Sequence, residues 1–164
     1  MPSYKQFVDQ ENHKKVNHII EPLPYYVKDF FNHIHNTSSR TRLAYAYNIR
    51  HFLRWLVENN PEIKELKDIS IDVMDALRVP DIDEYLATYS VENTPAGLAQ
   101  KMSALNNLFS YLANTKAIQM NPMIGTNRVK VESKPILRLE NTQVEQLLNT
   151  IEYGERVEMR RNTA

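Results

Sequence analysis

The sequence predicts an all-α protein, in which a compact bundle of about four helices is followed by a linker and one further helix. Apolar residues recur three and four positions apart over most of the chain, which is the spacing of one helix face. Strand signals are nearly absent, and the short alternation "RVKVESKPIL" at 128–137 is the one weak candidate. Only three glycines occur, which disfavours tight β-hairpins. The length of 164 residues fits one domain with a small appendage.

The first two expected helices are separated by a clear capping signal. The first begins near Pro22 or Pro24, because proline is tolerated in the opening turn of a helix, and it continues through "YYVKDFFNHI". Residues 1–21 before it are an N-terminal extension. The cluster "NTSSR" at 36–40 then supplies capping residues for a second helix, which runs to about Glu58 and is stopped by "NNP" at 59–61.

The middle of the chain predicts shorter elements and then another long helix. "KDISIDVMDALRV" indicates a loop with a short turn of helix, and "VPDIDEYLATY" indicates a helix with Pro80 near its first turn. A fourth long helix begins at "TPAGL", with Thr94 as its cap and Pro95 at its first position. Its apolar stripe contains Leu98, Met102, Leu105, Phe109 and Leu112. Residues 22–125 therefore form the expected bundle.

The remaining segment has a different character. Residues 126–137 lack a helical period and contain Pro135, so we expect an interdomain linker. The stretch "TQVEQLLNTI" then predicts an amphipathic helix with Val144, Leu147, Leu148 and Ile151 on one face. This helix has no partner of its own in the sequence, which suggests that residues 138–164 begin a second domain.

The composition excludes several classes of protein. Cysteine is absent, so disulfides and thiolate chemistry are excluded, and the chain suits a reducing cytoplasm. No apolar run approaches the roughly 20 residues that span a bilayer, and the N-terminus lacks the apolar core of a signal peptide. Lysine plus arginine equal aspartate plus glutamate, at 20 each.

The charges are nevertheless segregated along the chain. No acid occurs between Asp29 and Glu58, where four arginines lie, and none occurs between Glu92 and Glu132. The segment from Pro61 to Asn93 carries nine acids against three bases. If the two acid-free segments lie side by side, the neutral chain has one basic face, as nucleic-acid-binding proteins do.

The helical periodicity predicts which residues form this face. At about 100° per residue, Tyr45, Ile49, Phe52, Leu53 and Leu56 point inward from the second helix, whereas His51 joins the arginines outside. Arginine can bond two phosphate or guanine acceptors at once, and Asn, Gln, Ser and Tyr can grip phosphates or read bases. Arg42 falls on the inward side, but in the first turn it could still reach a DNA backbone. The expected DNA-binding residues are Arg40, Arg42, Tyr47, Arg50, Arg54, Gln100, Lys101, Ser103 and Asn107.

Other chemistry finds little support in the sequence. The "HIH" at 33–35 places its two histidines on different sides of a helix, so no metal site is assigned. No nucleophile elbow and no glycine-rich phosphate loop occur, and no catalytic residue, cofactor or small-molecule substrate is assigned. An arginine-rich helix face is also common as a mere solvated surface. A second acid-free helix, together with the acid-rich segment between the two, makes DNA binding as well supported as a solvated surface.

Three blocks in order carry a resemblance to a known family. "SRTRLAYAYNIRHFLRWLVEN", "VPDIDEYLATY" and "LAQKMSALNNLFSYLANTKAIQMNPM" together resemble the N-terminal core-binding domain of tyrosine recombinases of the phage-integrase and Xer group. "PLPYYVKDFF" is similar to the opening of the single-recombinase Xer type, and "LRLENTQVEQLLNTI" looks like the first helix of the catalytic domain. Residues 138–164 would then be the truncated start of that domain.

The resemblance implies a SAM-like bundle of about four to five helices that arches over double-stranded DNA. It implies half of a clamp on a recombination core site, with other recombinase protomers as partners. In this family the attacking tyrosine and its arginines belong to the C-terminal domain, so none is carried over. Two positions depart from the pattern: Gln100 replaces a basic residue, and Glu140 replaces a helix-capping threonine. Two alternatives remain, a stand-alone helical DNA-binding regulator and a protein-interaction bundle.

Overall fold

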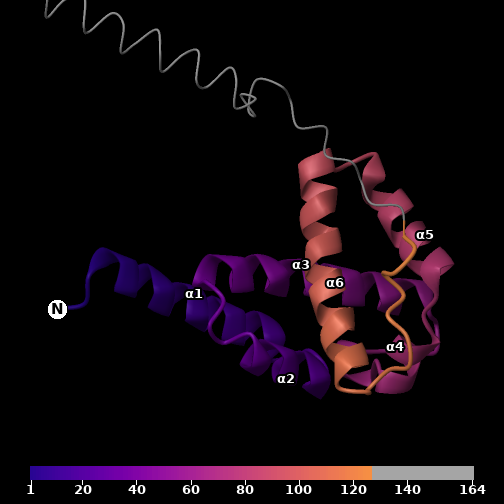
Figure 1. The fold of residues 1–164 in the computed structure, drawn as a ribbon, viewed down its shortest axis with the longest axis horizontal. Coiled ribbons are helices and arrows are strands. Elements are labelled where there is room, and N and C mark those ends of the chain that lie inside the picture. Colours follow the sequence, from indigo (N-terminus) through magenta and orange to yellow (C-terminus); the bar gives the residue numbers. More distant parts are fainter. Residues whose placement is uncertain (127–164) are drawn as a thin grey trace, which may run out of the picture. The chain divides into compact units, whose positions relative to one another are not determined.

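The computed structural model describes residues 1–126, which are built from helices and loops (Figure 1). No strand occurs within this range, so the all-α prediction is confirmed there. The expected linker at 126–137, apart from its first residue, and the expected helix at 142–151 lie outside the described residues. The elements are α1 (Tyr4–Ile20), α2 (Tyr25–His33), α3 (Ser39–Asn59), the 3-10 helix η1 (Leu66–Asp68), α4 (Ile71–Ala76), α5 (Val79–Ser90) and α6 (Pro95–Asn114).

Local capping sets the start of the two longest helices. The hydroxyl of Ser38 accepts a hydrogen bond from the Thr41 amide at 3.2 Å, which satisfies a free donor in the first turn of α3. Thr94 does the same for α6 through the Gly97 amide at 3.1 Å, and Pro95 follows it at the first helical position. The boundaries predicted for these helices are therefore confirmed, because short-range sequence signals determine them.

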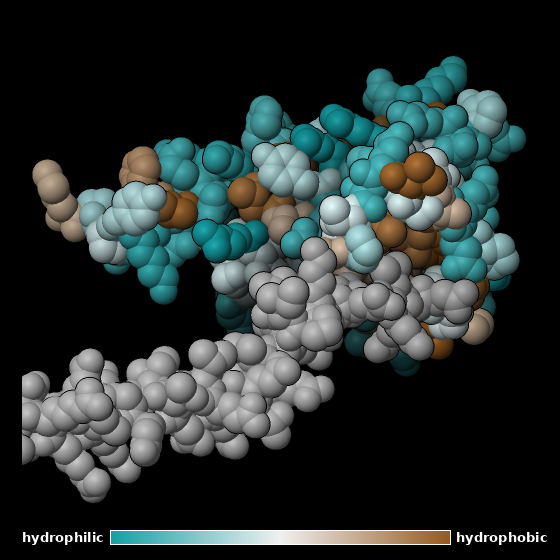
Figure 2. Space-filling model, turned by 90° about the horizontal axis from the view of Figure 1, so that it is seen from above, coloured by the Kyte–Doolittle hydropathy of each residue, from teal (hydrophilic) through white to brown (hydrophobic). Residues whose placement is uncertain are grey.

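Helix α1 was not expected from the sequence, which placed the first helix near Pro22 or Pro24. Its start is fixed by a capping box between Ser3 and Gln6. Only its last turns are buried, through Val16, Ile19 and Ile20, so the apolar stripe is too short to stand out in the sequence. The N-terminal turns leave Tyr4 and Phe7 exposed. This part of α1 extends beyond the rest of the bundle, at the left of Figures 1 and 2.

A partly buried polar contact helps to hold α1 against α3. The Ser39 hydroxyl donates to the Asp9 carboxylate at 2.6 Å and accepts from the Asn12 side-chain amide at 3.1 Å. Ser39 is only 7% exposed, and these bonds satisfy its hydroxyl. The start of α3 is thereby linked to the middle of α1, about one to two turns before the buried apolar residues of α1 begin.

Helix α3 lies at the centre of the bundle. It packs most extensively against α1 and α6, and α6 runs across it (Figure 1). The inner side of α3 is formed by Ala46, Ile49, Phe52, Leu53, Trp55 and Leu56, all buried. The Phe52 ring meets Tyr85 of α5 edge-on at 5.0 Å and Phe109 of α6 edge-on at 6.0 Å, measured between ring centroids. These edge-to-face contacts add stabilisation beyond burial alone.

Helix α2 closes another side of the core. The Tyr26 hydroxyl donates to the backbone carbonyl of Ile69 at 2.9 Å, which ties α2 to the segment before α4. Burial raises the pKa of Tyr26, so its hydroxyl stays protonated and remains a donor.

Within the described residues, none of the helices combines the length and the apolar character that crossing a membrane requires.

Replacing Phe52 by alanine should lower the free energy of unfolding by about 3–5 kcal/mol, because it leaves a cavity among three helices. Urea unfolding followed by circular dichroism would measure this. Val91→Ala is the control, since Val91 is 90% exposed and its truncation should change stability by less than about 0.5 kcal/mol. Equal stabilities for the two variants would show that Phe52 does not anchor the core.

Candidate nucleic-acid interface

The outer face of α3 carries most of the predicted arginines. Arg40 and Arg54 are exposed, and Tyr47 is 46% exposed between them. The guanidinium of Arg50, which is half-buried, lies 5.3 Å from the centre of the Tyr47 ring. An arginine held over an aromatic face keeps its charge and loses part of its freedom, which favours contact with an anion. The first acid along this helix is the exposed Glu58, in its last turn.

The outer face of α6 is polar and adjoins α3 along a seam. Gln100, Ser103 and Asn107 are exposed, as the helical spacing predicts. The Asn107 side-chain amide donates to the Tyr45 hydroxyl at 3.1 Å and also to the Ser103 carbonyl at 2.8 Å. The Lys101 ammonium donates to the Asn48 side-chain oxygen at 3.4 Å. Two side-chain hydrogen bonds therefore join the polar faces of the two helices.

The sequence predicted a different position for one residue of this seam, Tyr45, and another, Asn48, was not identified from it. Tyr45 was expected on the core face of α3, but it is only half-buried, and its hydroxyl reaches the surface beside Asn107. Asn48 was not singled out. Both positions lie on the flank of α3 that faces α6, and a helical wheel alone cannot tell which flank a neighbouring helix will cover.

His51 also differs from its expected place on the outer face. The structure turns it toward α5, where its Nδ1 lies 2.8 Å from the Tyr85 hydroxyl and its ring meets Tyr89 edge-on at 4.4 Å. Burial lowers the pKa of His51, and the nearby Lys101 ammonium lowers it further. The neutral imidazole therefore contributes a hydrogen-bonding group rather than a positive charge to this surface.

Lys101 occupies the junction of α3, α5 and α6. Its ammonium lies 5.9 Å from the centre of the Tyr89 ring, at the outer limit of the cation–π range. Burial lowers the pKa of Lys101, because the charged form is partly removed from water. Its contacts with Asn48 and Tyr89 leave Lys101 less free to move than a lysine on an open surface.

Arg42 has a structural contact of its own. Its Nε donates to the backbone carbonyl of Thr37 at 3.1 Å, in the turn that leads into α3. The side chain is half-buried, in keeping with the inward position that the helical wheel gives it. This bond holds the start of α3 and leaves the guanidinium less available for an external phosphate than those of Arg40 and Arg54.

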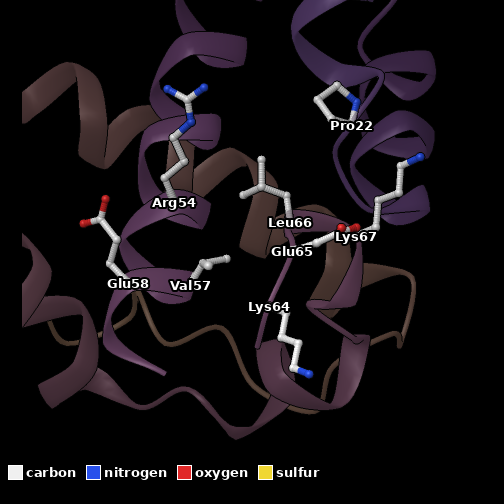
Figure 3. A pocket seen from close by; sticks show the side chains of 8 residues that line it. All are labelled: Pro22, Arg54, Val57, Glu58, Lys64, Glu65, Leu66 and Lys67. Atoms are coloured by element: carbon white, nitrogen blue, oxygen red, sulfur yellow. The ribbon is translucent and has the colours of Figure 1, made fainter. Parts of the chain in front are cut away.

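Two hollows border the arginine face of α3. The first, the α1–α3 groove, has a volume of about 320 Å³ and is lined by Glu11, Lys14, Lys15, His18, Ile19, Tyr47 and Arg50. The second has a volume of about 430 Å³ and contains Arg54 at its edge (Figure 3). In Figure 3 Val57 and Leu66 point into it, and charged groups surround them. Lys14, Lys15 and His18 were not identified from the sequence, because α1 was not expected as a helix.

The histidines of "HIH" have ordinary roles. The His33 ring packs against Tyr111 with 4.9 Å between centroids, and His35 Nδ1 lies 3.0 Å from the Asn32 carbonyl. Across residues 1–126, no three histidine, cysteine or acidic side chains are grouped as a metal ion would require.

Comparison with known proteins identifies the class of protein that carries this helical surface. The family model described as "Phage integrase, N-terminal SAM-like domain" matches residues 27–116, and the chain belongs to this family. A protein named tyrosine recombinase from Pseudothermotoga lettingae is 28% identical over 123 residues, which cover 73% of this chain and 39% of that protein. One named tyrosine recombinase XerC, from Caldanaerobacter subterraneus subsp. tengcongensis, is 26% identical over 135 residues, covering 76% and 38%.

These matches cover only part of each relative, so they establish the family of this chain and not the activity of a whole recombinase. The chain spans less than two fifths of the length of each of the two recombinases. No solved structure matches it significantly. The family and its helical fold agree with the resemblance drawn from the ordered sequence blocks, whereas the DNA-binding residues remain predictions.

The His51 imidazole should titrate below its ordinary pKa of 6.5, which an NMR pH titration of its ring protons would measure. Because the folded-state pKa is lowered, the stability that the neutral ring contributes is present above pH 6.5 and is lost as the pH falls below it. His51→Gln should therefore reduce the loss of stability on acidification. A midpoint at or above 6.5 would contradict the buried, hydrogen-bonded arrangement.

Proposed function

We propose that this chain is the DNA-binding N-terminal part of a site-specific tyrosine recombinase, and that it forms half of a clamp on a recombination core half-site. One observation carries the proposal: the outer faces of α3 and α6, both poor in acids, are joined by hydrogen bonds. These are the Tyr45–Asn107 and Lys101–Asn48 bonds. Membership of the phage-integrase SAM-like family supports it. The attack on the phosphodiester belongs to a catalytic domain, and no residue of this chain is assigned to it.

The two helices divide the work of binding. The exposed guanidiniums of Arg40 and Arg54, with Arg50 beside Tyr47, contact backbone phosphates and supply most of the affinity. The shorter polar side chains of α6, Gln100, Ser103 and Asn107, contact base edges or sugar–phosphate oxygens. Each of these groups donates hydrogen bonds, and a carboxylate among them would repel the DNA. This repulsion explains the absence of acids from the facing parts of both helices.

The seam between the helices has a positioning role in this proposal. Asn48 and Tyr45 hold Lys101 and Asn107 at fixed places relative to the arginines of α3, so the two faces bind as one rigid surface. Rigid donors bind with less loss of side-chain entropy than mobile ones. Arg42 acts mainly on the turn before α3 and makes at most a secondary backbone contact.

The other elements of the proposal follow from recombination itself. The partners are double-stranded DNA and further recombinase protomers assembled on it, with no cofactor, metal or small-molecule substrate. The protein works in the cytoplasm, where its DNA substrate lies, and the cysteine-free sequence suits that setting.

Replacing Arg40, Arg50 or Lys101 by alanine should weaken duplex binding. Each lost phosphate contact should lower the slope of log affinity against log salt by about 0.9. Fluorescence anisotropy with a labelled duplex, measured between about 50 and 200 mM salt, would give affinity and slope together.

Asp72→Asn and Glu84→Gln are the controls. Both side chains are exposed, and both belong to the acidic segment that separates α3 from α6 in the sequence. Neither should weaken binding. If all three basic variants keep the affinity and slope of the parent, the assigned surface is wrong. A parent chain with no salt-dependent affinity for duplexes would instead favour the protein-interaction alternative.

A further inference from the structure

The α1–α3 groove concentrates positive charge beside the outer face of α3. Three of its lining side chains are basic, Lys14, Lys15 and Arg50, and one is an acid, Glu11. The cations come from two helices that pack against each other. Folding therefore brings Lys15 and Arg50 together, although they are 35 residues apart in the sequence.

The single acid of the groove is already engaged. The Lys14 ammonium forms an ion pair with the Glu11 carboxylate at 3.2 Å, one turn apart on α1. Within residues 1–126, neither Lys15 nor Arg50 has a carboxylate within ion-pair distance. The groove thus retains two uncompensated cations, and His18 adds a further nitrogen donor.

The groove is continuous with the surface assigned to DNA. Tyr47 and Arg50 line the groove and also belong to the outer face of α3, where Tyr47 is exposed and Arg50 is half-buried. The Arg50 guanidinium lies over the Tyr47 ring, so a cation is held at the edge that the groove and the outer face share. A DNA strand that contacts Tyr47 would therefore have its next phosphates beside α1, because the phosphates of one strand follow each other about every 3.4 Å along the helix axis.

We propose that the α1–α3 groove binds a backbone phosphate of the DNA that lies on α3, with Lys15 and Arg50 as its principal contacts. Helix α1 is then part of the DNA-binding surface as well as a support for α3. This inference rests on the proposed function. The chemistry of the groove selects a phosphodiester rather than a base, since lysine and arginine on a shallow surface supply charge and donors without a pattern that distinguishes bases.

Lys15→Ala tests the groove through α1 alone, without disturbing the face of α3. The variant should bind duplexes of any sequence more weakly, with a salt slope lower by about 0.9 and an affinity roughly eightfold lower at 0.1 M salt. Lys15→Arg should restore the slope, because it keeps the charge. Fluorescence anisotropy over a range of salt concentrations would measure both quantities.

Lys5→Ala is the matched control. It removes the same charge from the exposed first turns of the same helix, away from the groove, and should keep the parent's slope. If the parent binds duplexes with a steep salt slope but Lys15→Ala behaves like Lys5→Ala, the groove inference is overturned and the proposed function stands. If the parent itself shows no salt-dependent duplex binding, the proposed function fails and this inference fails with it.

Discussion

The burial of α3 between α1 and α6 is the constraint on which the rest of the structure depends. Phe52 lies at the centre of this packing, in contact with the rings of Tyr85 and Phe109. A helix covered on two flanks and underneath has only one strip of side chains left for solvent. On α3 that strip holds Arg40, Tyr47 and Arg54, so the core packing itself determines which residues can meet a ligand.

The same packing alters the pKa values of polar side chains on the flanks of α3 and gives them hydrogen-bond partners. Where α6 and α5 close over the helix, His51 and Lys101 lose water, and burial lowers the pKa of each. Their hydrogen bonds to Tyr85 and Asn48 compensate for part of this loss. The described residues contain no buried side-chain nitrogen or oxygen without a hydrogen-bond partner, which indicates a seam of defined geometry.

The long helices could be predicted because their signals are local. Ser38 and Thr94 cap α3 and α6 through amides three residues away, and the apolar stripes of both helices repeat over several turns. Helix α1 escaped prediction for the opposite reason. Its buried side chains occupy only its last turns, and one of its contacts with α3 joins Asp9 to Ser39, 30 residues further along the chain. No local window contains both partners of that contact.

The sequence by itself determined the helical class, the caps of α3 and α6, and the separation of acids from the two basic helices, since each depends on residue type or on spacing within a few turns. Only the tertiary structure decided which flank of each helix is covered. It turned His51 inward, brought Tyr45 to the surface beside Asn107, and placed Lys15 near Arg50 in one groove. These relations depend on how helices pack against each other, and that packing follows from the shape of the whole core.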